Sequence, residues 1–190
     1  MQLKGSKTEK NLLAAFAGES QARNRYTYFA SAAKKEGYEQ IAALFLETAE
    51  NEKEHAKRFF KLLEGGMVEF TATFPAGSIG TTAENLKAAA EGEYEEWTKL
   101  YPGAAEIAEK EGFRDIAAVF RQIAKVEVQH EKRYRKLLDN VEKAKVFRKD
   151  AAASWTCRNC GYHHEGTEPP DQCPACLHPK NYFEVSAENY

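Results

Sequence analysis

Two Glu-x-x-His pairs, Glu52–His55 and Glu127–His130, are the residues of this chain best suited to chemistry. A spacing of three residues places both side chains of a pair on one face of a helix. The other residues on these two faces are largely apolar: Ile41, Phe45, Thr48, Phe59 and Leu62, and Ile116, Phe120, Ile123, Tyr134 and Leu137. Burying an unpaired carboxylate costs several kcal/mol. We therefore expect a positive partner at each pair, and two metal ions would supply it.

Further acids complete a known pattern. Glu19 lies on the first predicted helix and Glu93 on the third. One glutamate from each of two helices, with Glu-x-x-His from each of the other two, is typical of di-iron and di-manganese carboxylate proteins. Carboxylate and imidazole donors suit iron or manganese. Glu52 and Glu127 would bridge the two ions, and the alternative for the acid–histidine pairs is an internal salt-bridge network.

Glu96 makes the predicted site asymmetric. It follows Glu93 by three residues on the same helical face, whereas Arg23 stands at the closest equivalent position of the first helix. The alternative for Glu96 is a solvated surface charge. Tyr26 and Tyr101 are expected to hydrogen-bond ligand carboxylates, or else to be ordinary core aromatics. Four neighbouring acids point off the buried faces and are expected in solvent: Glu50, Glu54, Glu95 and Glu131.

A second candidate metal site contains all four cysteines, as Cys157-x-x-Cys160 and Cys173-x-x-Cys176. Two such motifs are a strong metal signal. The segment from Ser154 onward is too short to fold on an apolar core alone, so the metal would supply most of its folding free energy. Four sulfur ligands admit zinc or iron, and the spacing does not choose between them. Three histidines are surplus to this site and expected to be exposed: His163, His164 and His178.

The apolar periodicity predicts four helices, at residues 6–35, 38–64, about 82–111 and about 113–145. Ser6 or Thr8 would cap the first, and Thr81 or Thr82 the third. Residues 65–80 lack a helical pattern. Extended, they reach roughly 50 Å, which exceeds the length of a helix over 38–64, about 40 Å. The third helix can therefore start parallel to the second.

This order predicts a mainly α protein, namely a ferritin-like four-helix bundle with one long crossover. A small metal-bound domain follows at the C-terminus. We expect the domains at 1–146 and 154–190, with a linker at 147–153 that extends the last helix.

The two helical hairpins are repeats of one another. Residues 35–43 match residues 110–118 at an offset of 75, which also relates Tyr26 to Tyr101 and His55 to His130. Gly18-Glu19, however, matches Gly92-Glu93 at an offset of 74. The third helix therefore holds one extra residue. An insertion of this kind is accommodated as a π-bulge, often at functional sites, and Pro102 removes a backbone donor nearby. We predict a bulge within residues 93–102.

Charge and hydropathy exclude several classes of protein. The formal net charge is −2, which does not indicate a nucleic-acid-binding surface. The first nine residues are polar and lack the apolar core of a signal peptide. No apolar run approaches the roughly 20 residues of a membrane-spanning helix. These features predict a cytoplasmic protein with neither nucleic acid nor membrane as a partner.

Several segments together resemble rubrerythrin: residues 17–26, with Ala-Gly-Glu-Ser-Gln-Ala-Arg-Asn-Arg-Tyr, the two Glu-x-x-His motifs, and Glu93-x-x-Glu96. Cys-x-x-Cys-Gly-Tyr and Cys-Pro-x-Cys are similar to rubredoxin. The resemblance implies a non-haem di-iron centre and one further iron on four cysteines, three iron ions per chain, with zinc as a possible substitute. The implied di-iron ligands are Glu19, Glu52, His55, Glu93, Glu96, Glu127 and His130. The implied ligands of the third iron are Cys157, Cys160, Cys173 and Cys176.

The resemblance also implies an activity: reduction of hydrogen peroxide to water in oxidative stress defence. Electrons would come from NADH through rubredoxin or a reductase, and the protein would be a homodimer in which the relay of one subunit serves the other. One iron of the family moves between a glutamate and a histidine, which here implies Glu96 when oxidised and His55 when reduced. Tyr26 and Tyr101 would assist proton transfer. Leu177 stands where free rubredoxins usually have glycine.

Two other functions use the same residues. A ferroxidase would employ the carboxylate site with dioxygen as oxidant, although it needs no attached electron relay. A zinc-bound interaction module would need no catalysis at all. Turnover with peroxide against dioxygen separates the first from a peroxidase, and metal content separates the second.

Overall fold

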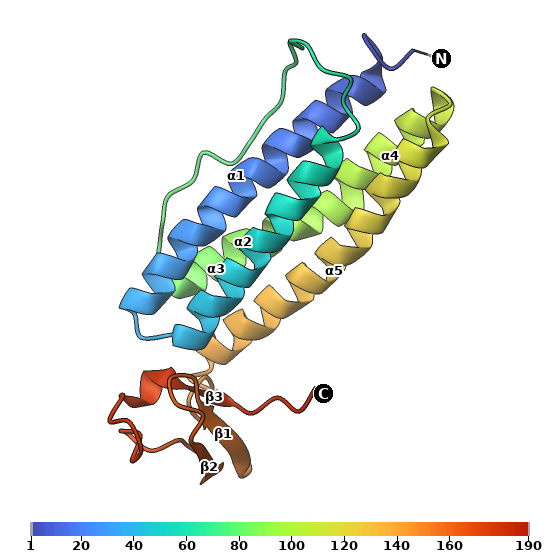
Figure 1. The fold of residues 1–190 in the computed structure, drawn as a ribbon. Helices are drawn as coiled ribbons and strands as arrows, with labels where there is room; N and C mark the ends of the chain where they lie inside the picture. Colours follow the sequence, from blue (N-terminus) through green and yellow to red (C-terminus); the bar gives the residue numbers. More distant parts are fainter. Residues whose placement is uncertain (1, 190) are drawn as a thin grey trace.

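The computed structural model describes residues 2–189. Four helical stretches run side by side (Figure 1). Their elements are α1 (Lys7–Lys35), α2 (Glu39–Phe60), α3 (Thr82–Glu95), the π-helix η1 (Glu96–Leu100), α4 (Tyr101–Lys110) and α5 (Arg114–Glu142). α3, η1 and α4 form one continuous stretch. Across the described residues, no helix combines the length and the apolar character needed to cross a membrane. The predicted four-helix bundle is confirmed.

The two hairpins turn in the same way. Gly37 and Gly112 have φ values of +84° and +83°, a left-handed conformation that glycine adopts without a steric penalty. The next amides, those of Tyr38 and Phe113, donate to carbonyls five residues earlier at 2.9 and 2.8 Å. The repeat seen in the sequence is therefore a repeat of backbone structure, and it places equivalent side chains of both hairpins at the same height.

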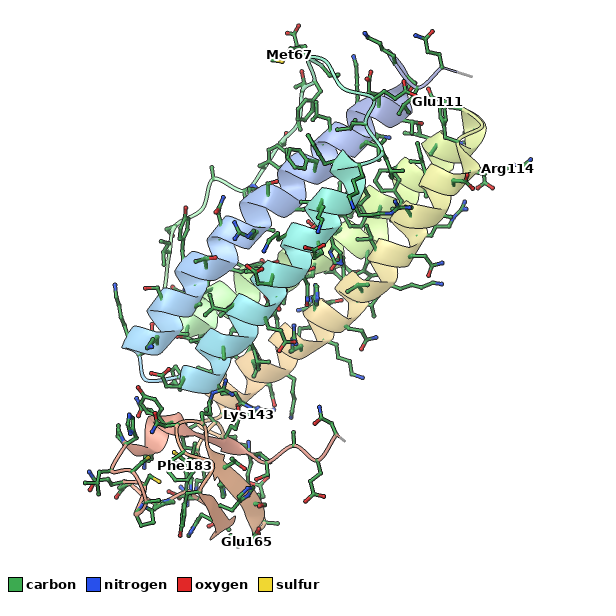
Figure 2. All side chains as sticks on the ribbon, viewed as in Figure 1. Met67, Glu111, Arg114, Lys143, Glu165 and Phe183 are labelled. Atoms are coloured by element: carbon green, nitrogen blue, oxygen red, sulfur yellow. The ribbon has the colours of Figure 1, made fainter. Side chains whose placement is uncertain are left out.

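The crossover between α2 and α3 is long and has no helix in residues 64–81. It runs along the outside of α1 from one end of the bundle to the other, so that α3 starts parallel to α2 (Figure 1). Met67 lies at its tip, fully exposed (Figure 2). Thr81 then caps α3 in a capping box with Glu84. α2 ends at Phe60, four residues before the predicted end.

The extra residue of the third stretch forms the predicted bulge. The amide of Tyr101 donates to the carbonyl of Glu96, five residues earlier, and η1 ends just before Pro102. The prediction of a π-bulge within residues 93–102 is therefore confirmed. The wider turn brings Tyr101 back onto the face that Glu93 occupies, although the two are eight residues apart. The corresponding spacing on α1, from Glu19 to Tyr26, is seven.

Apolar cores fill the bundle at either side of the acid–histidine residues. One contains Phe29, Phe45, Leu86 and Tyr134, and the other contains Leu12, Phe59, Tyr101 and Phe120. The charged residues thus form a polar layer between two apolar ones. Since both cores are closely packed, they hold the helices that carry this layer in fixed positions.

The C-terminal region is a small antiparallel sheet in the order β2-β1-β3. Its elements are β1 (Ala153–Cys157), β2 (His163–Gly166), the 3₁₀ turn η2 (Lys180–Tyr182) and β3 (Phe183–Val185). Its few buried apolar residues, centred on Trp155 and Phe183, include Cys157 and Cys173. This core is small enough that the four cysteines are part of what holds the region together.

The expectation that residues 147–153 extend the last helix is wrong. α5 ends at Glu142, and Ala144 takes a left-handed conformation with φ +53° that breaks the helix. The chain then turns back, and the ring of Phe147 stacks on Tyr38 with centroids 6.1 Å apart. The C-terminal region therefore lies at the end of the bundle, next to the α1–α2 turn (Figure 1). The Asn181 side chain there lies 3.5 Å from where a Cβ atom added at Gly37 would be.

Candidate metal centres

Each helical stretch contributes to one buried cluster of charged residues. α1 provides Glu19 and α3 provides Glu93, while α2 and α5 each provide a Glu-x-x-His pair. The four glutamates Glu19, Glu52, Glu93 and Glu127 are at most 1% exposed. The sequence prediction that these residues meet inside the bundle is confirmed.

The cluster divides into two overlapping groups of possible metal ligands. Glu19, Glu52, His55 and Glu127 form one, and Glu52, Glu93, Glu127 and His130 form the other. Within each group the ligand atoms lie within 4.8 Å of one another. Glu52 and Glu127 belong to both groups, so each can place one oxygen toward either ion. This sharing is the arrangement expected of two bridging carboxylates.

Both histidines present Nδ1 to the shared acids. His55 Nδ1 lies 2.9 Å from Glu52 Oε2 and 3.0 Å from Glu127 Oε1. His130 Nδ1 lies 3.1 Å from Glu52 Oε1 and 2.8 Å from Glu127 Oε2. The two oxygens of each shared glutamate are thus divided between the two histidines, one to each.

Unpaired buried atoms indicate what the cluster binds. Within residues 2–189, one oxygen each of Glu19, Glu52 and Glu93, both oxygens of Glu127, and Nδ1 of His130 are buried without a hydrogen-bond partner. Buried polar groups are seldom left unsatisfied. A cation between these atoms would satisfy all of them, and oxygen and imidazole donors suit iron or manganese. The donor set therefore fits two metal ions.

The pKa values show the same need for positive charge. Burial raises the pKa of Glu19 well above its usual range. Burial, with the nearby charge of Glu52, raises the pKa of Glu93 to about 8. Burial lowers the pKa of His130, but the carboxylates of Glu127 and Glu52 beside its Nδ1 outweigh this effect and raise it to about 12. In the absence of metal the cluster therefore holds protons in place of the cations.

Tyr26 and Tyr101 hydrogen-bond the cluster in a reciprocal way. The Tyr26 hydroxyl on α1 donates to Glu93 on the third stretch, and the Tyr101 hydroxyl there donates to Glu19 on α1. Both rings are at most 3% exposed. The predicted hydrogen bonds from these two hydroxyls to carboxylates of the cluster are present. The π-bulge makes the second bond possible, since it absorbs the extra residue before Tyr101.

Glu96 stands outside both ligand groups. It is half-buried beside the cluster, where burial and the charges of Glu19 and Glu93 raise its pKa. Arg23, its closest equivalent in the sequence prediction, instead pairs with Glu50 at 3.5 Å. Glu96 lies three residues after Glu93, and the residue three after Glu19 in the other hairpin is the buried Ala22. The asymmetry predicted for Glu96 is therefore present, because the equivalent position of the first hairpin holds an apolar residue.

Asn51 contacts His130, and the sequence analysis did not predict this contact. Its Oδ1 lies 3.3 Å from Nε2 of His130, the ring nitrogen that faces away from the shared acids. The repeat-equivalent of Asn51 is Val126, which offers no polar atom to His55. A second hydrogen bond of this kind orients a metal-binding histidine and fixes its tautomer. The pairing of Asn51 with Val126 at an offset of 75 was the available signal.

The neighbouring acids divide into two kinds. Glu50, Glu54 and Glu95 are exposed as predicted. The expectation for Glu131 is wrong, because it is only 9% exposed. Trp97 Nε1 donates to Glu131 at 2.6 Å, and Arg135 pairs with the same carboxylate. Trp97 belongs to η1, so the bulge turns the ring that covers this acid.

The four cysteines converge at the second candidate site. The distance from Cys157 Sγ to Cys176 Sγ is 3.8 Å, and that from Cys160 Sγ to Cys173 Sγ is 3.6 Å. Disulfide sulfurs would be about 2.05 Å apart. A tetrahedron with metal–sulfur bonds of about 2.3 Å has edges of about 3.8 Å. The four sulfurs are therefore placed for one tetrahedral metal ion.

The two cysteine loops have the same backbone structure. The amides of Gly161 and Leu177 donate to Cys157 and Cys173 carbonyls at 2.8 and 2.9 Å. Gly161 has φ +76° and Leu177 φ +61°, although leucine rarely adopts this conformation. The backbone amide of His178 hydrogen-bonds Cys176 and lowers the pKa of its thiol to about 6. The backbone of the second loop thus repeats that of the first, and Leu177 is strained as a result.

Residues 10–138 match the sequence model of rubrerythrin, and residues 155–184 match that of the rubredoxin-like domain of rubrerythrin. The chain belongs to the rubrerythrin family. Family membership makes the acid–histidine cluster a candidate di-iron centre and the four cysteines a candidate rubredoxin-like site.

Full-length relatives extend this likeness over the whole chain. A rubrerythrin of Porphyromonas gingivalis is 68% identical over 188 residues, covering 99% of this chain and 94% of the relative. The rubrerythrin of Nitratidesulfovibrio vulgaris is 56% identical, with 99% and 98% covered. The structure of nigerythrin in a mixed-valence state matches with a TM-score of 0.64 and 34% identity, covering 96% of this chain and 90% of that one.

A bacterioferritin structure from Desulfovibrio desulfuricans matches with a TM-score of 0.63 at 21% identity, covering 73% of this chain and 82% of that one. At that identity the likeness concerns the fold alone. The bundle is therefore ferritin-like, as the long crossover predicted, and a rubredoxin-like region follows it.

Proposed function

We propose that this protein is a non-haem di-iron peroxidase that reduces hydrogen peroxide to water in defence against oxidative stress. The overall reaction is H₂O₂ + 2 H⁺ + 2 e⁻ → 2 H₂O. The observation that carries the proposal is the pair of ligand groups that share Glu52 and Glu127, with buried oxygens lacking partners. Nigerythrin, a relative with a fully reduced, all-ferrous structure, supports iron as the metal.

In this proposal the ligand sets follow the two groups of the cluster. Glu19 and His55 would hold one iron, Glu93 and His130 would hold the other, and Glu52 and Glu127 would serve both. When bound, the two ferrous ions supply the two electrons that cleave the O–O bond. Glu96 is the alternative ligand on the His55 side, because an iron of higher charge favours an anionic ligand over a neutral imidazole. His130 remains a ligand throughout.

The side chains around the cluster manage water and protons. The hydroxyls of Tyr26 and Tyr101 donate hydrogen bonds to Glu93 and Glu19, which keeps these carboxylates oriented. Glu96 is half-buried beside the cluster and can carry a proton between solvent and the reacting oxygen. The apolar cores on either side exclude water from the rest of the layer.

The four-cysteine site would act as an electron relay when it holds iron, whereas zinc, which has no redox chemistry, would fill the site without passing electrons. Sulfur from the four cysteines would occupy every position around the iron, so the site would pass electrons but not bind peroxide. Its donor would be a rubredoxin or an NADH-dependent reductase. The small region lies near Tyr38, and Glu52 is about 20 Å further along α2 at 1.5 Å per residue. This separation supports a homodimer in which each relay serves the partner's di-iron centre.

The four cysteines form no disulfide with one another, which supports a cytoplasmic location. Nothing in the charge of the chain favours nucleic acid as a partner.

The test begins with metal analysis and a visible spectrum, followed by anaerobic reduction and titration with hydrogen peroxide. We expect three iron ions per chain and rapid reoxidation, with one peroxide consumed per two electrons. The matched control is the double variant Cys157→Ser/Cys160→Ser. It should keep a single turnover at the di-iron centre and lose multiple turnovers with an external donor.

Other outcomes would favour other functions. Faster reoxidation by dioxygen than by peroxide would replace the peroxidase with a ferroxidase. A colourless protein that contains zinc and no iron would support a non-catalytic interaction module instead.

A further inference from the structure

A cavity of about 710 Å³ lies between α1 and the stretch formed by α3, η1 and α4. Residues 72–75 of the crossover line its outer side. At its inner side it is lined by Tyr26, Tyr101 and Glu96, which contact or flank the acid–histidine cluster. The cavity therefore adjoins the residues that surround the candidate di-iron centre, on the side where Glu96 lies.

Small residues keep this cavity open. Gly18, Gly92 and Gly103 all line it from helices, together with alanines of α1 and α4. A Cβ atom added at Gly92 or Gly103 would meet nothing within 4 Å. Glycine inside a helix is less stable than alanine by roughly 0.5–1 kcal/mol. The chain thus accepts weaker helices at these positions, and the space beside them stays empty of side chains.

The repeat strengthens this point. Gly18 and Gly92 are equivalent positions of the two hairpins, and each immediately precedes a candidate ligand, Glu19 or Glu93. The cavity is thereby built from both halves of the bundle at the height of the cluster. Phe74 of the crossover lies across Gly18, 3.8 Å from where a Cβ atom would be.

The size and lining of the cavity exceed what hydrogen peroxide needs. One water molecule occupies about 30 Å³ in the liquid, and hydrogen peroxide is only one oxygen larger. Pockets for organic ligands measure about 300–1,000 Å³ and are mostly apolar. Here the apolar lining includes Phe74, Pro75, Leu100 and Ile107. The lining also contains polar residues such as Asn11, Gln21 and Arg25, but hydrogen peroxide has no use for the apolar part, which can bury a hydrocarbon substituent.

We propose that the cavity binds organic hydroperoxides with an apolar substituent, and that the protein reduces them at the adjacent centre. This inference rests on the proposed peroxidase function and widens its substrate class. The reaction is ROOH + 2 H⁺ + 2 e⁻ → ROH + H₂O. The O–O bond breaks, the two electrons come from the same one-electron donors, and the alcohol leaves through the cavity.

The first test measures binding without turnover. The probe is 2-phenyl-2-propanol, the alcohol formed from cumene hydroperoxide, titrated by calorimetry into the zinc-loaded protein. We expect one binding site per chain, with affinity at least tenfold weaker in Gly92→Leu. Gly92→Ala is the matched control, because it gains helix stability but fills little of the cavity. Gly103→Leu repeats the test from α4 in case Gly92→Leu does not fold.

The second test compares kcat/KM for cumene hydroperoxide and for hydrogen peroxide in the iron-loaded protein. The ratio of the two should fall at least tenfold in Gly92→Leu and in Gly103→Leu, and stay unchanged in Gly92→Ala. An unchanged ratio in both leucine variants would overturn the proposal.

Failure of the cavity proposal and failure of the peroxidase proposal are distinguishable. If hydrogen peroxide is reduced while the alcohol does not bind and cumene hydroperoxide is not reduced, the cavity proposal is wrong and the peroxidase proposal stands. If neither peroxide is reduced, the peroxidase proposal is wrong, and the cavity proposal falls with it.

Discussion

His55 and His130 occupy equivalent positions in the two halves of the bundle, and each presents Nδ1 to the same two glutamates. Their outer sides differ. The His130 side chain is 4% exposed, and its Nε2 lies beside Asn51. The His55 side chain is 13% exposed, and the residue equivalent to Asn51 in the other hairpin is the apolar Val126. A spare carboxylate, Glu96, lies on only one stretch.

The asymmetry of the site therefore arises outside its most buried residues. The four buried glutamates and two histidines follow the repeat closely. The residues that flank them do not, since Asn51 is opposed by Val126 and Glu96 by Ala22. A duplicated hairpin can therefore supply two similar metal positions, and a few substitutions around them can make one position rigid and the other exchangeable.

The largest expected effect comes from removing each histidine in turn. His130→Ala should lose one of the two bundle metals and lower peroxide turnover at least a hundredfold, because no spare carboxylate lies on its side. His55→Ala should retain both metals, with Glu96 replacing the lost ligand. Metal content after reconstitution and gel filtration measures this difference. Equal losses in the two variants would contradict the proposed division of roles.

Removing the metals should make the bundle sensitive to pH. The folded pKa of Glu93 is about 8, above its unfolded value of about 4.3. The folded state therefore binds the proton more tightly, and stability falls as pH rises from about 5 to 8. The raised pKa values of Glu19 and His130 act in the same direction.

Urea denaturation of the metal-free protein at pH 5, 6.5 and 8 measures this effect. Glu93→Gln, which cannot ionise, should have a shallower decline than the unsubstituted chain. The metal-loaded protein is the control, since its cations replace the protons and should remove the decline. A metal-free bundle that gains stability over this range would contradict the assignment of Glu93 as a protonated acid.

Exchanging the outer partners of the two histidines should reverse part of the difference between them. Asn51→Val removes the hydrogen bond to His130 and should weaken metal binding on that side about tenfold, the lower end for such contacts. Val126→Asn offers His55 the same partner and should slow exchange between His55 and Glu96. Imidazole ¹⁵N spectra of the zinc-loaded protein report the tautomer of each ring. If Asn51→Val leaves the His130 signal unchanged, Asn51 does not orient it.

Much of this site could be predicted from the sequence, because a repeat offset is a property of the chain itself. The repeat offset is 75 residues between Glu52 and Glu127 but 74 between Glu19 and Glu93, so one residue is inserted in the third helical stretch. The helix accommodates it as the bulge at η1. The meeting of the acid–histidine residues inside the bundle and their hydrogen bonds from Tyr26 and Tyr101 could be predicted in the same way. These predictions depend on counting residues along helices.

Other features depend on how separate elements meet. The contact of Asn51 with His130 joins α2 to α5, and burial of Glu131 requires the ring of Trp97 turned by the bulge. The cavity exists because two hairpins do not close upon one another between α1 and α4. The end of α5 depends on Ala144 taking a left-handed conformation, which alanine does not signal. None of these is a property of one helix.

The smallest expected effect concerns the two cysteine loops, which differ where Gly161 in the first corresponds to Leu177 in the second. Both residues are left-handed, and this conformation costs a non-glycine residue about 1–2 kcal/mol. Leu177 is 67% exposed, so its removal forfeits little burial. Leu177→Gly should therefore stabilise the small region by up to about 1 kcal/mol, after the greater freedom of glycine when unfolded is subtracted. Thermal loss of the sulfur–metal absorption band measures it, and Gly161→Leu, the reverse change in the other loop, should destabilise the region by a similar amount.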